Sequence, residues 1–173
     1  KKAMLGFIAG IAAAVYAAAK QQEIEKRLAV VLKSTAGAAG LSHAALLKHA
    51  AALERVTTFG DEAIIGAQAL LLTFKDIKGD VFNRTTELIL DMSVALGQDL
   101  KQGAIQVGKA LNDPILGITA LSRVGVTFTE DQKEMIKTLV KSGKVVEAQA
   151  LILTELESEF GGMSRAIDTF QGA

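Results

Sequence analysis

The stretch NDPILGITALSR, residues 112–123, marks the start of a helix. Asp113 is a preferred N-cap residue, because its carboxylate can accept a hydrogen bond from a free amide of the first helical turn. Pro114 suits the first helical position, where its missing amide leaves no hydrogen bond unmade. A short helix is therefore predicted over residues 115–123. Gly125 is expected to end it, since glycine readily adopts the left-handed conformation that terminates helices.

A second helix start follows after a few residues. Residues 126–128, Val-Thr-Phe, are expected to be briefly extended. Thr129 and Gln132 then have the spacing of a capping box, in which each side chain bonds the backbone amide of the other residue. A helix is predicted over residues 130–141, with Gly143 just beyond its end. Two capped helices so close together indicate a helical chain with short connections.

Outward from this stretch, the same kinds of signal recur in both directions. Further helices are expected from the N-terminal region to about Ser34, and over residues 43–55, 61–74, 81–96, 99–111 and 145–160. The residues expected to begin the later helices are Ser42, Thr58 with Asp61, Asp80 and Asp99. The inner face of the helix over residues 81–96 is expected to carry Val81, Leu88, Met92 and Leu96. Ser164 is expected to begin a last turn.

Composition narrows the class of protein. Of 173 residues, half are hydrophobic and 5% aromatic, with one proline, no cysteine and equal numbers of basic and acidic side chains. The lack of cysteine excludes a disulfide scaffold, a thiolate metal site and a cysteine nucleophile. The zero net charge gives no general electrostatic reason to bind nucleic acid, so sequence-specific nucleic-acid binding is not expected. The aliphatic, proline-poor composition is typical of helices.

These observations predict an all-α fold, with several short capped helices in a compact or semi-extended bundle. A long apolar N-terminal helix is expected to precede the bundle. Two domains are expected: an Ala/Gly-rich helix with its linker over residues 1–40, and a helical module over residues 41–173. Because the chain begins with Lys1 and ends without a closing signal, we expect it to be a fragment of a longer protein.

The N-terminal run AMLGFIAGIAAAVYAAA begins at Ala3, ends at Ala19 and contains no charge. Three interpretations are open: a secretory signal, a helix that spans or disturbs a membrane, and a buried or helix-pairing segment of a multimer. The helical pattern continues beyond Lys20, with Ile24, Leu28 and Val31 on one face, which disfavours a signal. Small residues recur along the run at every fourth position, which permits close approach between helices: Gly6, Gly10, Ala14 and Ala18.

No catalytic, cofactor-binding or metal-binding residue is assigned. The sequence GAIQVGKA, residues 103–110, has the glycine and lysine spacing of a phosphate loop, but Ala110 replaces the hydroxyl residue that holds magnesium. It also falls inside a predicted helix. His43 and His49 are six residues apart, do not share a helix face, and are interpreted as surface imidazoles. No cofactor and no enzyme activity are expected.

Charged and aromatic residues elsewhere are expected to have structural roles. Glu155, Glu157 and Glu159 are interpreted as a solvated helix face. A basic stripe is interrupted by acidic residues, which disfavours a nucleic-acid interface; it consists of Lys133, Lys137, Lys141 and Lys144. The phenylalanines are expected to anchor the core and the helix ends: Phe7, Phe59, Phe74, Phe82, Phe128, Phe160 and Phe170.

The segment GKALNDP, residues 108–114, resembles the tail length tape-measure proteins of long-tailed bacteriophages and prophages. Residues 67–74 (AQALLLTF) and 80–82 (DVF) resemble the preceding part of that family. The following residues continue the resemblance: Ile115, Gly117, Ala120, Leu121, Arg123, Gly125, Val126, Phe128, Thr129, Gln132 and Lys133. It extends through Ala148, Gln149, Ile152, Leu153, Glu155, Leu156, Phe160, Gly161 and Gly162, and covers about residues 56–163.

The resemblance implies a structural role. Tape-measure proteins are mostly helical, lie in several copies within the tail tube, set its length, and leave ahead of the genome. The partners implied are the tail tube protein, tail tip or baseplate proteins and tail assembly chaperones, with a homo-oligomer expected. The implied locations are the tail lumen of the virion, the host cytoplasm during assembly, and the host envelope after ejection.

Two other classes compete with this interpretation. A membrane-inserting or pore-forming helical protein unrelated to tails would use the run from Ala3 to Ala19 against a host membrane. A cell-wall hydrolase, of the sort that some tape measures carry, would need an acidic or metal constellation that the sequence does not supply.

Overall fold

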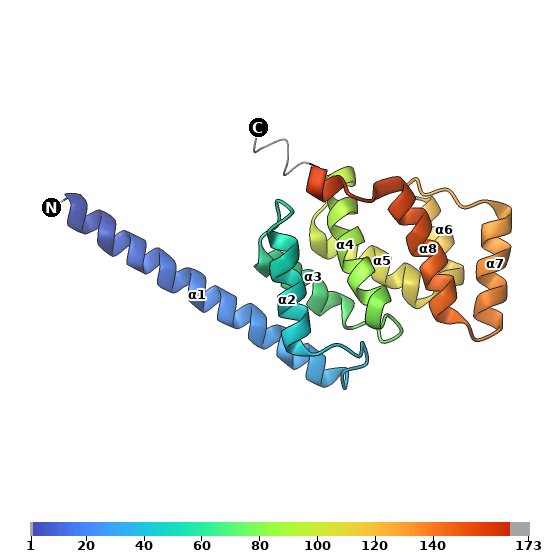
Figure 1. The fold of residues 1–173 in the computed structure, drawn as a ribbon, viewed down its shortest axis with the longest axis horizontal. Helices are drawn as coiled ribbons and strands as arrows, with labels where there is room; N and C mark the ends of the chain where they lie inside the picture. Colours follow the sequence, from blue (N-terminus) through green and yellow to red (C-terminus); the bar gives the residue numbers. More distant parts are fainter. Residues whose placement is uncertain (1, 167–173) are drawn as a thin grey trace.

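The computed structural model describes the backbone of residues 2–166 and the side chains of residues 11–166. This part of the chain contains helices and no strand (Figure 1), so the all-α prediction is confirmed for it. The helices are α1 (Lys2–Ser34), α2 (His43–Glu54), α3 (Asp61–Leu71), α4 (Gly79–Leu96), α5 (Leu100–Asn112), α6 (Pro114–Ser122), α7 (Glu130–Lys141) and α8 (Val145–Phe160).

The body packs around α5 and α4. Helix α5 contacts α3, α4 and α6, while α8 packs against α4 and α7. The largest fully buried side chains include Phe82, Ile64, Ile89 and Met92. Every phenylalanine whose side chain is described lies in this core or packs against it, as predicted: Phe59, Phe74, Phe82, Phe128 and Phe160. Phe7 and Phe170, expected to do the same, lie outside the described side chains.

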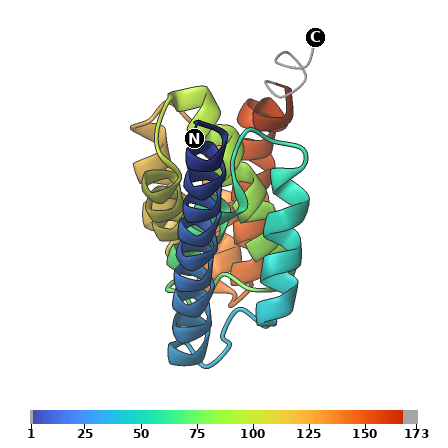
Figure 2. The same ribbon diagram turned by 90° about the vertical axis from the view of Figure 1, so that its left-hand side faces the viewer.

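Helix α1 is a long rod that leaves the body (Figure 1). Figure 2, viewed from the side of the N-terminus, shows it in front of the other helices. Leu28 is fully buried, and Ile24 and Val31 pack against the core, as the predicted face requires. The side chains of residues 11–20 are all exposed. The division of the chain at residue 40 stays a prediction.

The local helix starts follow the sequence signals closely. Ser42, Asp99 and Asp113 each accept a hydrogen bond from an amide in the first turn of α2, α5 and α6, respectively. Thr129 and Gln132 form the complete capping box of α7. These four predictions are confirmed because a cap depends only on residues within one turn of it.

Two predicted helix starts are wrong. Helix α3 has Gly60 as its N-cap, without a side-chain cap. The predicted box of Thr58 with Asp61 does not form, and the preceding Thr57 hydroxyl instead donates to Leu53 O at 2.9 Å, back into α2. Helix α4 begins at Gly79, so Asp80 lies within its first turn rather than capping it.

Leu96 is also predicted wrongly. It is 40% exposed, whereas the other three residues of the predicted inner face are buried. Helix α4 stops at this residue, because Gly97 adopts a left-handed conformation with φ of 63°. The core therefore ends one turn before the hydrophobic pattern does.

Glycines permit two of the closest contacts around α5. A Cβ on Gly108 would overlap the ring of Phe74, and a Cβ on Gly117 of α6 would overlap the Ala110 carbonyl oxygen of α5. The tight α5–α6 hairpin thus depends on Gly117, while Gly108 allows the Phe74 ring to pack closely against α5. Because residues 103–110 lie within α5, their interpretation as helix is confirmed.

Candidate functional site

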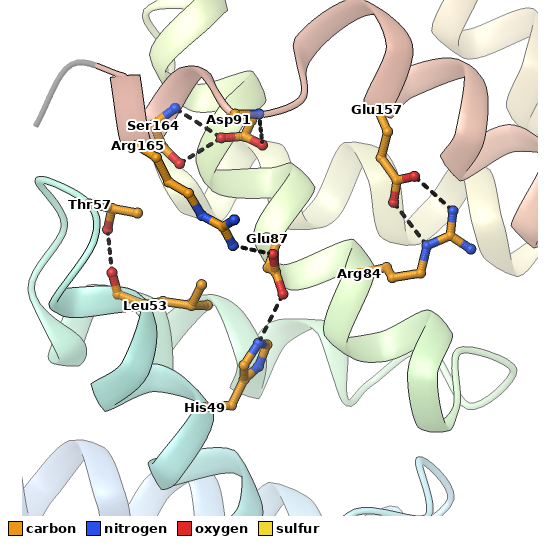
Figure 3. A network of polar contacts seen from close by, with 10 residues as sticks. His49, Leu53, Thr57, Arg84, Glu87, Asp91, Glu157, Ser164 and Arg165 are labelled. Atoms are coloured by element: carbon orange, nitrogen blue, oxygen red, sulfur yellow. Dashed lines mark hydrogen bonds and ion pairs between the residues drawn. The ribbon is translucent and has the colours of Figure 1, made fainter. Parts of the chain in front are cut away.

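A network of polar contacts joins α2, α4, α8 and the turn that follows α8 (Figure 3). Its centre is Asp91 on α4, a side chain only 8% exposed. The Asp91 carboxylate accepts hydrogen bonds from Gly162 N and Ser164 N, each at 2.9 Å, and from Ser164 Oγ at 2.6 Å. Residues 163–166 form a helical turn. Asp91 therefore caps this turn from another helix, as an N-cap residue would do locally.

Glu87 lies one turn before Asp91 on α4 and bridges two other segments. Its carboxylate accepts a hydrogen bond from the Arg165 guanidinium, and lies 3.5 Å from His49 Nε2 of α2. The bond to His49 and the charge of Arg165 hold the pKa of Glu87 below its ordinary value, and partial burial opposes them. Glu87 thus links α2 to the C-terminal turn through α4.

Arg84 is the third residue of α4 in this network, beside Glu87 and Asp91. Its guanidinium donates to both carboxylate oxygens of Glu157 on α8, with Nε–Oε1 and Nη2–Oε2 distances of 2.9 and 2.8 Å. The hydrogen bond to Glu157 raises the pKa of Arg84, and burial opposes it. A two-point contact of this kind fixes orientation as well as distance. Successive turns of α4 therefore hold α8, α2 and the C-terminal turn.

The groups in this network do not form a hydrolytic triad. The Ser164 hydroxyl contacts Asp91, whereas His49 contacts Glu87, so the hydroxyl and the imidazole have different carboxylate partners. Activation of serine needs an imidazole beside the hydroxyl. A hollow of about 170 Å³ lies beside these groups, lined by residues that already have partners, including Arg84 and Arg165. The arrangement ties helices together rather than presenting a free nucleophile.

The two histidines are not brought together. His43 Nε2 lies 3.2 Å from the Glu25 carbonyl oxygen of α1, while His49 faces Glu87. The interpretation as surface imidazoles is wrong for His49, whose side chain is 18% exposed and faces Glu87 of α4. Within residues that the structure describes, no group of three or more potential metal ligands is found.

The three glutamates of α8 do not form a solvated face. Besides the Glu157 contact, Glu155 accepts a hydrogen bond from Gln132 Nε2 at 2.6 Å, and Glu159 accepts one from Thr127 N at 3.2 Å. All three are partly buried. The prediction is wrong because α7, α4 and the segment before α7 surround α8, so its opposite faces each meet a neighbour.

The basic stripe of α7 is largely paired. Lys133 and Lys137 each form an ion pair with the acidic residue three positions earlier, and Lys144 pairs with Glu147. Such exposed pairs contribute little stability, because water and salt screen them. They nevertheless neutralise much of the stripe's charge.

Sequence reasoning singled out Ser164, Glu157 and His49 without their contacts, and it missed Arg84, Glu87, Asp91 and Arg165. Asp91 carried a usable signal, because it interrupts the apolar inner face of α4 between Leu88 and Met92. A carboxylate at such a position needs hydrogen-bonding partners. Arg84 and Arg165 carried no usable signal in the sequence, since their partners lie more than 70 positions away.

The joint between α1 and the body consists of polar contacts beside the buried Leu28. Gln21 Nε2 donates to Asp61 Oδ2 at 2.9 Å and to Glu25 Oε1 at 3.0 Å. Burial and the charge of nearby Glu54 raise the pKa of Asp61, which the bond from Gln21 partly offsets. The joint fixes the direction in which residues 11–20 leave the body.

This exposed part of α1 is the second candidate surface, and we call residues 11–20 the arm. Its larger side chains are Ile11, Val15 and Tyr16, which are 51%, 63% and 74% exposed. The remainder is alanine apart from Lys20. No helix among the described residues is both long and apolar enough to cross a membrane. Comparison with family models, curated proteins and solved structures gives no match for this chain.

Proposed function

We propose that this chain is a structural segment of a tape-measure protein from the tail of a long-tailed phage or prophage. In this role it occupies the tail tube, helps to set the tube's length, scaffolds tube assembly and assists genome passage through the host envelope. Its proposed partners are the tube protein, tail tip or baseplate proteins and tail assembly chaperones. Its proposed locations are the tail lumen, the host cytoplasm during assembly, and the host envelope after ejection.

One observation carries the proposal: residues that support the resemblance have structural roles in one helical unit. Gly108 and Gly117 permit the close contacts of α5, and Thr129 with Gln132 caps α7. Gln149 is fully buried and donates to Asp76 O and Leu111 O, at 3.0 Å each. These residues shape backbone and packing, as expected of a passive building block.

The arm supports a second part of the proposal. The side chains of the arm are all exposed, whereas helices that are hydrophobic on every side are normally buried. We propose that α1 is a long apolar N-terminal helix. We also propose that the arms of several copies pack together inside the tube. At about 1.5 Å per residue, α1 spans about 50 Å. The folded body is too compact to measure much of a tail, so its proposed task is docking to the tip or the tube.

An in-frame deletion of residues 60–162 in the phage or prophage that encodes the chain tests this function. We expect shortened or absent tails and lost infectivity, measured by electron microscopy and plaque counts. Tails of normal length with full infectivity would contradict the proposal.

The exposed side chains of the arm also favour a second candidate, a membrane-inserting or pore-forming protein unrelated to tails. It predicts that the whole chain releases dye from liposomes, and that Ile11→Glu with Val15→Glu abolishes release. Release that these substitutions leave unchanged would count against it. Detection of the chain in purified tails would favour the tape-measure function.

A further inference from the structure

The outer side of the α5–α6 hairpin carries a wide hollow, which we call the α5–α6 groove. Its volume is about 680 Å³, and its lining includes Gln98, Lys101, Ile105, Lys109, Ala120 and Val124. Ile105 is 42% exposed and Val124 is 40% exposed. A second hollow adjoins it through Lys109 and Ala120 and reaches Leu116, which is 68% exposed. Together they give an exposed apolar strip across two helices.

The charged side chains that line the α5–α6 groove are mainly basic. Lys101, Lys109 and Arg123 line the groove, and none of them takes part in the ion pairs found among the described residues. The single acidic residue in the lining, Asp99, uses its carboxylate to cap α5 through Gln102 N at 2.9 Å. The groove thus has an apolar floor and a net positive lining, with three basic side chains against one carboxylate, although the chain as a whole is neutral.

We propose that the α5–α6 groove binds an amphipathic helix of a partner protein, with acidic side chains along both borders of its apolar face. The floor is suited to the apolar face of a helix, the usual mode of helix-in-groove recognition. Its basic lining residues select acidic flanks and disfavour basic ones. The groove lies on α5, α6 and the residues next to them, apart from the arm on α1.

Other occupants fit the charges less well. The arm of a second copy contains no acidic residue and ends at Lys20, so it brings positive charge to a net positive lining. A single-stranded nucleic acid needs aromatic side chains for base stacking, and the groove lining has none. An acidic amphipathic helix matches both the apolar floor and the basic lining residues.

The test uses the whole chain and two designed helical peptides of about 18 residues, which share one leucine face. One has glutamate along both borders of that face, and the other has lysine. Calorimetry measures affinity, and amide NMR shifts locate the contact. We expect the glutamate peptide to bind at residues 98–124 and the lysine peptide to bind at least about tenfold more weakly. Added salt should weaken the glutamate complex.

Matched variants separate the groove from general charge. The triple variant Lys101→Glu, Lys109→Glu, Arg123→Glu should bind the glutamate peptide at least about tenfold more weakly than wild type. The control Lys26→Glu, Lys48→Glu, Lys75→Glu makes the same charge change on exposed side chains elsewhere, and should retain affinity within about twofold. Unchanged circular dichroism and melting temperature verify that each variant is folded.

Several outcomes would overturn the proposal: equal affinity for both peptides, unchanged binding by the triple variant, or no binding of the glutamate peptide at millimolar concentration. Binding to phosphatidylserine vesicles with the same dependence on Lys101, Lys109 and Arg123, but no binding to the peptide, would indicate a membrane surface instead.

Discussion

Gly117 of α6 lies directly against Ala110 of α5, so closely that a Cβ at position 117 would overlap the Ala110 carbonyl oxygen. The obstacle is backbone, which cannot rotate away as a side-chain tip would. Asp113 and Pro114 turn the chain sharply between these two residues. The hairpin on which the α5–α6 groove is built therefore depends on a residue without a side chain.

Substitution Gly117→Ala should lower the free energy of unfolding by about 3 kcal/mol, because α6 must move away from α5 to accommodate the methyl group. The control is Gly66→Ala, within α3, where an added Cβ meets nothing within 4 Å. That variant should gain about 0.5–1 kcal/mol, since alanine favours helices over glycine. Urea denaturation measures both, and equal effects at the two positions would contradict the packing described here.

Substitution Asp91→Ala should release the turn at residues 161–166 from α4. It leaves two backbone amides and the Ser164 hydroxyl without their acceptor, at a cost of about 2–3 kcal/mol. Ser164→Ala removes only one of these three hydrogen bonds and should cost about 1 kcal/mol. Hydrogen exchange should show faster exchange of Gly162 and Ser164 amides in Asp91→Ala. Unchanged exchange there would show that Asp91 does not hold the turn.

Acid should weaken the contact at Glu87. Its pKa is lower in the folded protein than the ordinary value of 4.5, so its contribution to stability is complete above that pH. The contribution is lost as the pH falls through the lower folded pKa. The stability difference between wild type and Glu87→Gln should therefore shrink as the pH is lowered below 4.5. Because the carboxylate is partly exposed, solvent screening keeps this difference to about 1 kcal/mol or less. A stability difference that grows as the pH falls would contradict the lowered pKa of Glu87.

Self-association should depend on the arm. The triple variant Ile11→Ser, Val15→Ser, Tyr16→Ser removes the arm's large apolar side chains and should shift the chain toward monomer in sedimentation velocity. The control is Val30→Ser, on the same helix beside the body and 67% exposed. It should leave the distribution unchanged. Identical distributions for wild type and the triple variant would argue against packing of arms.

Features that depend on neighbours within one turn could be predicted from the sequence. The caps at Asp113 and Thr129 belong to this class. They are readable because local geometry decides them. The all-α class follows from their number and spacing.

Features that depend on which helices become neighbours could not be predicted. The carboxylates of α8 look solvated in sequence, and only the arrangement of α7 and α4 around them gives Glu155 and Glu157 their partners. Asp91 was detectable as a carboxylate on an apolar face, but its partner Ser164 was not.

The central claim is that this chain is a structural part of a phage tail, and labelling of purified tails tests it most directly. An antibody raised against α8 (Val145–Phe160), combined with mass spectrometry of tail fractions, would locate the chain. The account predicts peptides from the chain in purified tails, and gold label that appears only when tails are opened or at their tips. Tails free of the chain, with the protein found only in host membranes or cytoplasm, would contradict it.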